Sequence, residues 1–546
     1  MRYFIGIDVG TGSARAGLFD EHGLLLGTGA RPIAMFRPRH DYAEQSSRDI
    51  WEAICQSTRA ALGEAAVSPE QVAGIGFDAT CSLVALDVAG SPVTVSPTGN
   101  DDQNIIVWMD HRAVGEAKEI NGGGHDVLRY IGGVISPEME TPKLLWLKRN
   151  LPDSWSRIAH FFDLPDWLVY RATGTLTRSL CSAVCKWTYR GQWGREGQGW
   201  DDDYLHAIGL EDLAGQGHER IGQSFATPGK KVGELSVGAA AELGLVAGIP
   251  VAASLIDAYS GALGTLGAEP DASGLQSRLA IIAGTSTCHI TVSKDPAFVP
   301  GVWGPYYSVL LPELWANEAG QSAAGALIDR VLSGHAAIDA AKREAQEHNI
   351  SIFEFLDARL AALAGAGDTA LLTVHRHVQP DFHGNRSPLA DPMRKGAIVG
   401  LDMGAGIDDL AVDYLATIQA LAYGTRHIIE ALRDNGVSVE TLVVSGGLAR
   451  NTLFLRENAD ATGCQILVPD QVEPVLVGSA MLGAVAAGVY ADLEMAMGKM
   501  GGKGSRLSPR PALADFHNRK YRVFRKMQND YQAYAAIMAG GETKGN

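Results

Sequence analysis

Two short segments of the sequence share a pattern that suits the binding of phosphate groups. Each is an apolar run, a tight turn of Gly with Thr or Ser, and a second β-type run. The first turn is 10–13, and the second, 284–286, follows about 275 residues later. A strand–turn–strand of this kind directs backbone N–H groups and small hydroxyls into one concavity. Two copies predict two related half-molecules that hold one polyphosphate between them.

Charged residues flank the first turn. Asp8 ends the apolar run before it, and Arg15 follows it. A carboxylate in an apolar run is costly unless it meets a cation, and Mg²⁺ carried by a phosphate would supply one. Arg15 is spaced to add positive charge beside that phosphate. The alternative for one turn alone is an ordinary β-turn with a surface arginine, and the repetition favours phosphate binding.

Two later segments could complete such a site. Asp257 follows the apolar run 251–256 and precedes small residues, so it is either a helix N-cap or a general base facing a substrate hydroxyl. Gly446 and Gly447 follow a buried-strand pattern and open a helix. Glycines there let the backbone approach a flat ligand, and Asn451 could hydrogen-bond it. A purely structural two-glycine turn is the alternative.

Two polar clusters in the first half suit a polyhydroxylated ligand. Asp78 and Ser82 stand at the end of a predicted strand, and Trp108, Asp110 and Arg112 follow another. The indole ring could stack on C–H faces while the charged groups bind hydroxyls. The alternative is a structural salt bridge beside a core tryptophan.

The elements that must position these residues alternate between strands and helices. Strands are predicted at 3–9, 16–19, 24–27, 72–77, 82–87, 248–256 and 441–445. Helices are predicted at about 47–63, 112–120, 143–149, 165–173, 323–332, 409–435 and 478–488, with another from about 451. We expect a surface loop at 190–203, a hinge at 264–278 and a partly anchored tail beyond about residue 500.

Composition narrows the class of protein. A chain of 546 residues with 46% apolar and 20% charged residues predicts at least two soluble domains. The net charge of −16 argues against a nucleic-acid or anionic-membrane surface. No run approaches the ~20 apolar residues that span a bilayer, and Asp8 interrupts any signal peptide. Six cysteines do not form a disulfide framework in so long a chain, and Cys181 with Cys185 lack a second pair at zinc spacing. We expect a cytoplasmic protein.

Taken together, these motifs resemble the FGGY carbohydrate kinases, which belong to the actin, hexokinase and Hsp70 ATPase superfamily. The resemblance rests on four ordered motifs: 8–13, Gly284-Thr-Ser, Leu255-Ile-Asp-Ala and Gly446-Gly-Leu-Ala-Arg-Asn. Within the family, segments 77–84, 108–113 and 384–392 are most similar to the D-ribulokinase subgroup of pentulose kinases.

The resemblance implies an α/β fold of two RNase H-like domains flanking a deep interdomain cleft. Residues 1–264 would bind the sugar and carry the base, 265–495 would bind ATP, and 496–546 would form a C-terminal extension. It places ATP and its phosphates at Thr11, Gly12, Ser13, Arg15, Gly284, Thr285, Ser286, Gly446, Gly447 and Asn451. It places the sugar at Asp78, Ser82, Trp108, Asp110 and Arg112, the catalytic base at Asp257, and Mg²⁺ near Asp8 and Asp257.

The implied reaction is ATP-dependent phosphorylation of a ketopentose at its terminal hydroxyl, most simply D-ribulose to D-ribulose 5-phosphate. Other kinases of this family act on L-ribulose, xylulose, ribitol or glycerol, and these substrates stay open because such sugars differ by few hydrogen bonds. A nucleotide-switched interaction protein of the actin or Hsp70 type is the alternative from another class. Family analogy also implies a homodimer, with neither nucleic acid nor membrane as a partner.

Overall fold

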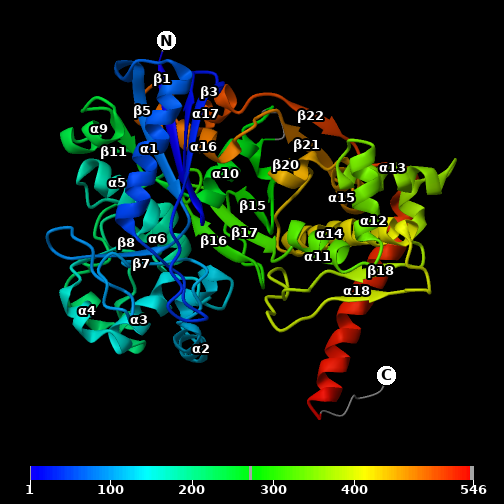
Figure 1. Ribbon diagram of the computed structural model, residues 1–546. Helices are drawn as coiled ribbons and strands as arrows, with labels where there is room; N and C mark the ends of the chain where they lie inside the picture. The colour runs from blue at the N-terminus through cyan, green and yellow to red at the C-terminus, as the bar shows by residue number, and fades with distance from the viewer. Residues whose placement is uncertain (1, 270–273, 541–546) are drawn as a thin grey trace.

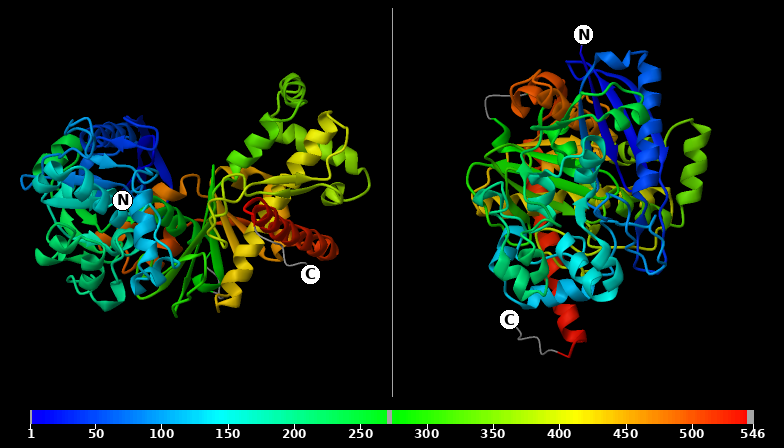
Figure 2. Two further views of the ribbon diagram at one scale, coloured as in Figure 1. Left: turned by 90° about the horizontal axis from the view of Figure 1, so that it is seen from below. Right: turned by 90° about the vertical axis from the view of Figure 1, so that its left-hand side faces the viewer.

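The computed structural model describes residues 2–269 and 274–540, which form two lobes joined through a central pair of helices (Figure 1). Each lobe is built around a seven-stranded sheet. Figure 2 shows, in its left view, how the chain divides into these two bodies.

The first sheet contains the first phosphate turn. Its strand order is β11-β12-β5-β1-β2-β3, with β13 also paired to β5. β1, β5 and β12 run parallel, and β2, β3 and β11 are antiparallel to their neighbours. β1 and β5 are apolar on both faces because helices cover the sheet on both sides. The strands are β1 (Tyr3–Val9), β2 (Ser13–Phe19), β3 (Leu25–Pro32), β5 (Val72–Ala79), β11 (Lys231–Glu234), β12 (Pro250–Ala252) and β13 (Leu255–Ile256).

The second sheet contains the second phosphate turn. Its order is β16-β17-β15-β14-β20-β21-β22, and β14, β20 and β21 are its parallel strands. The strands are β14 (Arg278–Ala283), β15 (Thr287–Ser293), β16 (Trp303–Tyr307), β17 (Trp315–Gln321), β20 (Thr441–Ser445), β21 (Gln465–Pro469) and β22 (Gly504–Leu507).

The two sheets repeat one topology. An antiparallel meander of three strands, β1-β2-β3 or β14-β15-β17, is extended by two parallel strands, β5 and β12 or β20 and β21. This arrangement confirms the predicted pair of RNase H-like folds. The repeat seen in the turns therefore extends to the whole sheet.

Helices and two small sheets fill out the first lobe, and a third small sheet belongs to the second. α1 packs against β2 and β3, while α5 lies against β5 and β8. The helices are α1 (Ser47–Ala65), α2 (Val114–Gly122), α3 (Glu140–Asn150), α4 (Pro152–Arg157), α5 (Leu164–Thr173), α6 (Leu180–Lys186), α7 (Asp202–Ala207), α8 (Glu211–Gly215) and α9 (Val237–Leu243). The small sheets pair β4 (Glu44–Gln45), β6 (Leu83–Leu86), β7 (Ile105–Ile106) and β8 (His160–Asp163); β9 (Arg178–Ser179) and β10 (Phe225–Ala226); and, in the second lobe, β18 (His377–Gln379) and β19 (Ala397–Val399).

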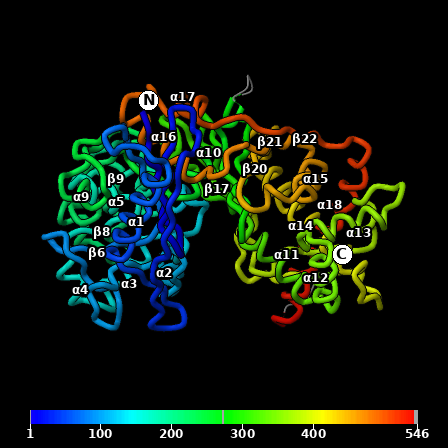
Figure 3. Tube along the Cα trace, turned by 45° about the horizontal axis from the view of Figure 1, so that its top comes forward, coloured from blue at the N-terminus to red at the C-terminus, as the bar shows by residue number. Residues whose placement is uncertain are grey.

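Two helices connect the lobes. α10 (Asp257–Leu266) contacts β13 and β5 of the first sheet and β14 and β20 of the second. α16 (Pro474–Ala486) comes late in the chain yet packs on β1 and β5 of the first sheet and on α10, as Figure 3 shows. Residues 474–486 therefore pack on the first lobe, although the sequence predicts the ATP-binding domain to continue to 495.

Glycines allow α16 to lie close to the first sheet. A Cβ on Gly6 would lie 2.0 Å from the Leu476 carbonyl oxygen, and one on Gly76 would lie 1.9 Å from that of Ser479. Such distances are far below van der Waals contact. The small-residue pattern of 478–488 correctly predicts a helix that packs very near another element.

Longer helices cover the second lobe. The helices are α11 (Gly325–Ser333), α12 (Ile338–Glu347), α13 (Ile352–Ala364), α14 (Ile407–Asp434), α15 (Thr452–Thr462) and α18 (Ala514–Met538). α17 (Leu493–Met500) packs instead on the connecting helices α16 and α10. α18 packs along α14, α15 and β18, and its last turns project beyond the lobe (Figure 1). The tail is thus helical and anchored over its first half.

Some sequence predictions differ in detail. The strand expected at 248–256 is divided into β12 and β13. The predicted surface loop 190–203 contains a short 3-10 helix, Gly191–Trp193, and the start of α7. In the hinge expected at 264–278, residues 264–266 end α10 and 270–273 lie outside the described residues. The six cysteines are free thiols, and no described helix is both long and apolar enough to cross a bilayer.

Candidate active site

The first phosphate turn is fixed by hydrogen bonds on one side and has open space on the other. The Gly10 N–H donates to the Ser13 carbonyl at 3.0 Å. Gln45 donates to the Thr11 carbonyl at 2.9 Å, and the Trp108 indole N–H donates to the Thr11 hydroxyl at 3.0 Å. A Cβ added to Gly12 would meet no atom within 4 Å. The turn therefore has room for a bound group directly above its backbone.

The second turn is closed by the same type of backbone bond, from the Gly284 N–H to the Ser286 carbonyl at 2.9 Å. The Thr285 carbonyl accepts from the backbone N–H of Ala324 at 2.8 Å. Gly284 and Thr285 are exposed. The start of α11 thus supports this turn and leaves its upper side to solvent.

The two-glycine segment lies beside the second turn. Gly446 has φ of 87°, and a Cβ there would lie 2.5 Å from the Ala283 carbonyl oxygen, so only glycine fits. Gly447 has open space around it. Asn451 caps α15 through the Phe454 N–H at 2.9 Å and donates to the Tyr414 hydroxyl at 2.7 Å. Gly447 is therefore accessible, whereas both ends of the Asn451 amide already have protein partners.

Three carboxyl groups meet at the ends of parallel strands. Asp8 of β1 pairs in register with Asp78 of β5, and Asp257 follows β13, which also pairs with β5. Asp8 is 2% exposed and receives hydrogen bonds from Arg15, whose other amino group donates to Glu473 at 2.9 Å. The charge of Arg15 is thus matched by two carboxylates in this conformation.

Burial and mutual repulsion act on two of these carboxyls. Burial, together with the charges of Asp8 and Asp257, raises the pKa of Asp78 well above its usual range. Asp78 also accepts a hydrogen bond of 2.5 Å from Ser479 of α16. A buried, neutral carboxyl with internal partners favours a structural role, so the structure gives no support to Asp78 as a sugar-binding residue.

Asp257 is the first residue of α10 and is half-buried. Its Oδ1 accepts from the Ala258 N–H at 2.7 Å, and the preceding Ile256, not Asp257, is the N-cap. Burial, followed by the charge of Asp8, raises the pKa of Asp257 to about 7, while Lys186 opposes the shift. A carboxyl with that pKa can accept a proton near neutral pH.

Asp110 and Arg112 do not face a ligand. Their side chains are 0% exposed, and the Arg112 guanidinium donates to Asp110 at 2.7 Å and to Glu44 at 2.8 Å. It also lies 4.1 Å from the Tyr42 ring centre and 5.0 Å from that of Trp146. The structure gives no support to the prediction that both residues bind sugar: a buried charge needs such internal partners, and these occupy the polar atoms.

Trp108 and Ser82 are linked to each other and to the first turn. Ser82 is fully buried, and its hydroxyl accepts from the Trp108 backbone N–H at 3.2 Å. The Trp108 ring is half-buried, and its indole N–H contacts Thr11. Ser82 therefore positions Trp108, and Trp108 in turn contacts Thr11 of the first turn.

Two residues that the sequence analysis did not single out, Lys186 and Glu318, lie close enough to Asp257 to affect its pKa. Lys186, at the end of α6, is 4% exposed, and its ammonium lies 4.5 Å from the Trp303 ring centre. Glu318 of β17 is 4% exposed, and Arg386 donates to it. Lys186 and Glu318 both shift the pKa of Asp257, in opposite directions.

Lys186 is the most informative of these residues. Burial by itself would lower the pKa of Lys186. The interactions with Cys81, Glu318 and Tyr306 outweigh burial and raise this pKa well above its usual value, so the ammonium stays charged. Among the described residues its ammonium makes no hydrogen bond and faces only the Trp303 ring. A buried ammonium with free donors is costly, and substrate hydroxyls would satisfy it. No motif marks Lys186 or Glu318, because they come from opposite lobes and meet only through the fold.

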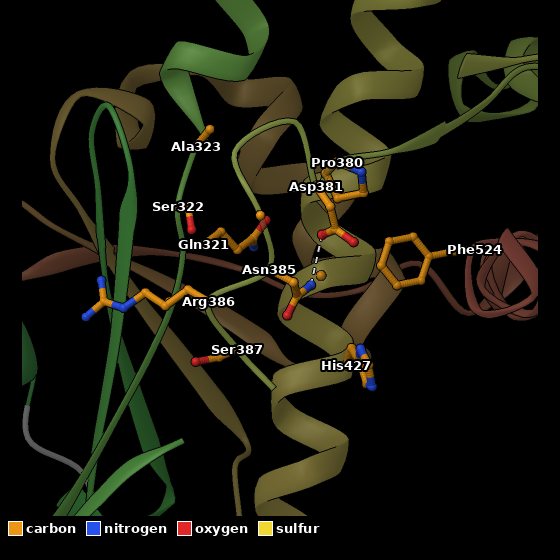
Figure 4. Close-up of a pocket in the computed structure, with 13 residues that line it drawn as sticks. Gln321, Ser322, Ala323, Pro380, Asp381, Asn385, Arg386, Ser387, His427 and Phe524 are labelled. Atoms are coloured by element: carbon orange, nitrogen blue, oxygen red, sulfur yellow. Dashed lines mark hydrogen bonds between the residues drawn. The ribbon is translucent and has the colours of Figure 1, made fainter. Parts of the chain in front are cut away.

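A narrow pocket opens beside this region in the second lobe (Figure 4). Its lining comes from the end of β17, the loop 380–387, α14 and α18. Among its residues, His427 is buried, and burial lowers the pKa of its imidazole to about 3.

The doubled sheet, with a phosphate turn in each half, defines a two-domain protein of the actin and hexokinase class. Solved structures agree on the fold. The xylulose kinase from Rhodospirillum rubrum superposes with a TM-score of 0.79 at 21% identity, covering 98% of this chain and 99% of that chain. The Plasmodium falciparum glycerol kinase with ADP gives a TM-score of 0.77 at 14% identity, covering 96% and 98%.

Sequence comparison defines the family. Residues 3–264 match the N-terminal domain of the FGGY family of carbohydrate kinases and residues 279–487 match its C-terminal domain, so the chain belongs to this family. A Homo sapiens FGGY carbohydrate kinase domain-containing protein is 48% identical over 546 residues, 98% of each chain. A Saccharomyces cerevisiae D-ribulokinase is 42% identical over 515 residues, 89% of this chain and 72% of that protein.

Proposed function

We propose that this protein uses Mg-ATP to phosphorylate a pentulose at its terminal hydroxyl, with D-ribulose as substrate and D-ribulose 5-phosphate as product. One observation carries the proposal. Asp257 lies close enough to Asp8, beside the first turn, and to the buried ammonium of Lys186 for both charges to shift its pKa. This supports a base with phosphates on one side and sugar hydroxyls on the other.

The proton step belongs to Asp257. Its carboxylate accepts the proton of the sugar hydroxyl as that oxygen attacks the γ-phosphorus of ATP. The new P–O bond forms while the bond from the γ-phosphorus to the β,γ-bridging oxygen breaks, and ADP leaves. The pKa of about 7 makes Asp257 a stronger base than an ordinary carboxylate and keeps much of it ionised at neutral pH.

The two turns would hold the phosphates from opposite lobes. Open space above Gly12 and Gly447, and the exposure of Gly284 and Thr285, support this arrangement. Phosphoryl transfer depends chiefly on positioning and charge stabilisation. Backbone N–H groups with Thr11, Ser13 and Ser286 hydroxyls supply the positioning, and Arg15 supplies positive charge once a phosphate competes for it. Asn451 would approach the nucleotide base only by sharing its amide with Tyr414.

The residues present fit a divalent cation. Mg²⁺ is commonly bound by one or two carboxylates together with substrate phosphates. Asp8 and Asp257 are close enough for the charge of one to raise the pKa of the other, and a cation shared with ATP would relieve that repulsion. Among the described residues, no group of three metal-binding side chains is present. The proposed ion is therefore held jointly with the nucleotide, whose phosphate charge it would neutralise.

We infer that Lys186, Glu318 and Trp108 form the sugar pocket. An ammonium and a carboxylate offer complementary hydrogen bonds to hydroxyl groups, and an indole face suits C–H groups. The D-ribulokinase of Saccharomyces cerevisiae, at 42% identity, supports D-ribulose over other sugars. A homodimer and a cytoplasmic location stay predictions.

A panel of sugars tests the substrate. We expect the highest kcat/KM with D-ribulose among D-ribulose, L-ribulose, D-xylulose, ribitol and glycerol, measured by coupled ADP release. A maximum with another sugar would keep the kinase but change its substrate. ATP hydrolysis that no sugar stimulates would instead support the nucleotide-switch alternative.

Substitution of Lys186 tests the pocket. Lys186→Met keeps the length of the side chain but removes its donors, so the sugar KM should rise about 10- to 100-fold with little change in the KM for ATP. Lys148 pairs with Asp212 at 2.9 Å and has no described contact with Asp257. Lys148→Met is therefore the matched control. An unchanged sugar KM in Lys186→Met would remove Lys186 from the pocket.

A further inference from the structure

The segment 384–392, which the proposed reaction does not yet use, forms a stiff loop between β18 and β19. The backbone N–H groups of Asn385 and Asp391 donate to each other's carbonyls, both at 2.9 Å. The Asn385 amide donates to Asp381 at 2.8 Å and accepts from the Leu389 N–H at 3.1 Å. Figure 4 shows the bond to Asp381. These four bonds fix the loop from within.

The loop also packs closely against β17 and against the connection between β15 and β16. Gly301 has φ of 72°, and a Cβ there would lie 1.9 Å from the Pro388 carbonyl oxygen. A Cβ on Gly320 of β17 would lie 3.1 Å from the Arg386 guanidinium. The loop therefore places Arg386 directly over β17, and its position is determined by close backbone contacts.

Arg386 extends away from its own loop toward the proposed sugar pocket. In Figure 4 its side chain points away from Asn385 and His427 and across the strands of the second sheet. One amino group donates to Glu318, and the other lies 3.6 Å from the Cys288 sulfur. Its guanidinium carbon is 4.5 Å from the Trp303 ring centre.

Two cations from different lobes contact the same indole. Lys186 of the first lobe lies 4.5 Å from the Trp303 ring centre, as Arg386 of the second lobe does. Glu318 lies close to both, because it hydrogen-bonds Arg386 and contributes to the charge environment of Lys186. Arg386 thus contacts both Glu318 and the indole that Lys186 also contacts.

We propose that the 384–392 loop exists to present Arg386, which acts as a positioning residue by fixing Glu318 and Trp303 for sugar binding. The planar fork of an arginine can hold a carboxylate and stack on an indole at once, whereas lysine cannot do both. Glu318 is 4% exposed, and a buried carboxylate without a cation is strongly disfavoured. This inference rests on the proposed function.

The test compares Arg386→Lys, Glu318→Gln and the double variant in full-length protein. Arg386→Lys keeps the charge and loses the fork, so the sugar KM should rise about 10-fold or more while the KM for ATP stays within about 2-fold. The double variant should be no worse than Glu318→Gln alone, because both changes remove one shared function. Arg426→Gln, from the partly buried Arg426–Glu430 pair of α14, removes an arginine of a different ion pair and is the control.

Each result has a distinct meaning. A lower melting temperature in Arg386→Lys with an unchanged sugar KM would overturn the proposal in favour of a purely structural ion pair. Additive effects of the two changes would overturn the link to Glu318. If Arg386→Lys does not fold, Arg386→Gln with Glu318→Gln removes both charges and must still show the raised sugar KM. If the wild-type protein phosphorylates no sugar, the proposed function fails together with this inference; if it is active and Arg386→Lys is normal, only the inference fails.

Discussion

The two lobes share one sheet topology but differ in the residues that flank each turn. Two residues before the first turn stands Asp8, which pairs across β1 and β2 with Arg15. At the same place before the second turn stands Ile282, which pairs with Cys288. The first turn therefore has a charged pair beneath it, and the second has none. We propose that both turns hold phosphate through their backbone and that only the first, with Asp8 beside it, also shares a cation with the nucleotide.

The sheets also differ where the connecting helices pack. Gly6 and Gly76 are neighbours in β1 and β5 and lie against α16. The matching neighbours in β14 and β20 are Ala280 and Val443. The first sheet has glycines, without side chains, where the backbone of α16 lies against it. The second sheet has side chains at the matching positions. Two sheets of the same topology thus differ in how closely a helix can pack on them.

The largest effect should come from Asp257→Asn, which tests whether the chemistry belongs to the first lobe. An amide cannot accept the hydroxyl proton, so kcat should fall about 10²- to 10⁴-fold. Nucleotide affinity, measured by calorimetry with ATP, should stay within a few-fold. Asp434→Asn is a control at the end of α14. Near-normal turnover would show that Asp257 is not the base.

A pair of substitutions sharpens the contrast between the turns. Asp8→Asn should lower kcat/KM about 100-fold and raise the Mg²⁺ concentration needed, because the first turn loses its charge. Thr285→Ala in the second turn should cost only about 5-fold, since backbone N–H groups remain. Steady-state kinetics over a Mg²⁺ series would measure both. Equal losses would contradict a division of labour between the turns.

Packing of α16 gives a prediction about stability. In Gly76→Ala the new methyl would collide with the Ser479 carbonyl at 1.9 Å, so the free energy of unfolding should drop by roughly 2 kcal/mol. Gly63→Ala, in α1 where a Cβ meets nothing within 4 Å, should raise it by about 0.5–1 kcal/mol. Urea denaturation would compare the two. A tolerated Gly76→Ala would mean that α16 can shift away from the sheet.

The smallest effect concerns a buried carboxyl of the second lobe that lies away from its turn. Burial raises the pKa of Glu457 in α15 to about 8. The folded state then keeps a proton that the unfolded state releases above its own pKa of 4.5. Stability from this group is therefore full at low pH and declines as pH rises toward 8.

Glu457→Gln should remove that decline. Between pH 5 and pH 7 the wild type should lose roughly 1–2 kcal/mol of unfolding free energy relative to the variant. The exposed Glu440→Gln is the control and should show no such difference. Denaturant titrations at both pH values would measure it, and parallel curves for wild type and Glu457→Gln would contradict the shifted pKa.

The sequence by itself determined the class of fold and predicted the residues of the reacting centre. The two Gly-Thr/Ser turns, Asp8 and Asp257 depend on local order: an apolar strand, then a turn or a helix start, with the polar residue at the junction. That order is written along the chain, so the double RNase H-like fold followed from it. The family match at 3–264 and 279–487 agrees.

Only the tertiary structure decided which polar residues are available to a ligand. Asp110 and Arg112 have the residue types of a sugar site, yet Glu44 and Tyr42 enclose them. Lys186, by contrast, carries no motif, and its ammonium contacts an indole ring and no described hydrogen-bond acceptor. Availability depends on which partners the fold brings from distant segments, and a buried charge is satisfied or left open by those partners alone. That pairing is a property of three-dimensional contact, which spacing along one chain does not contain.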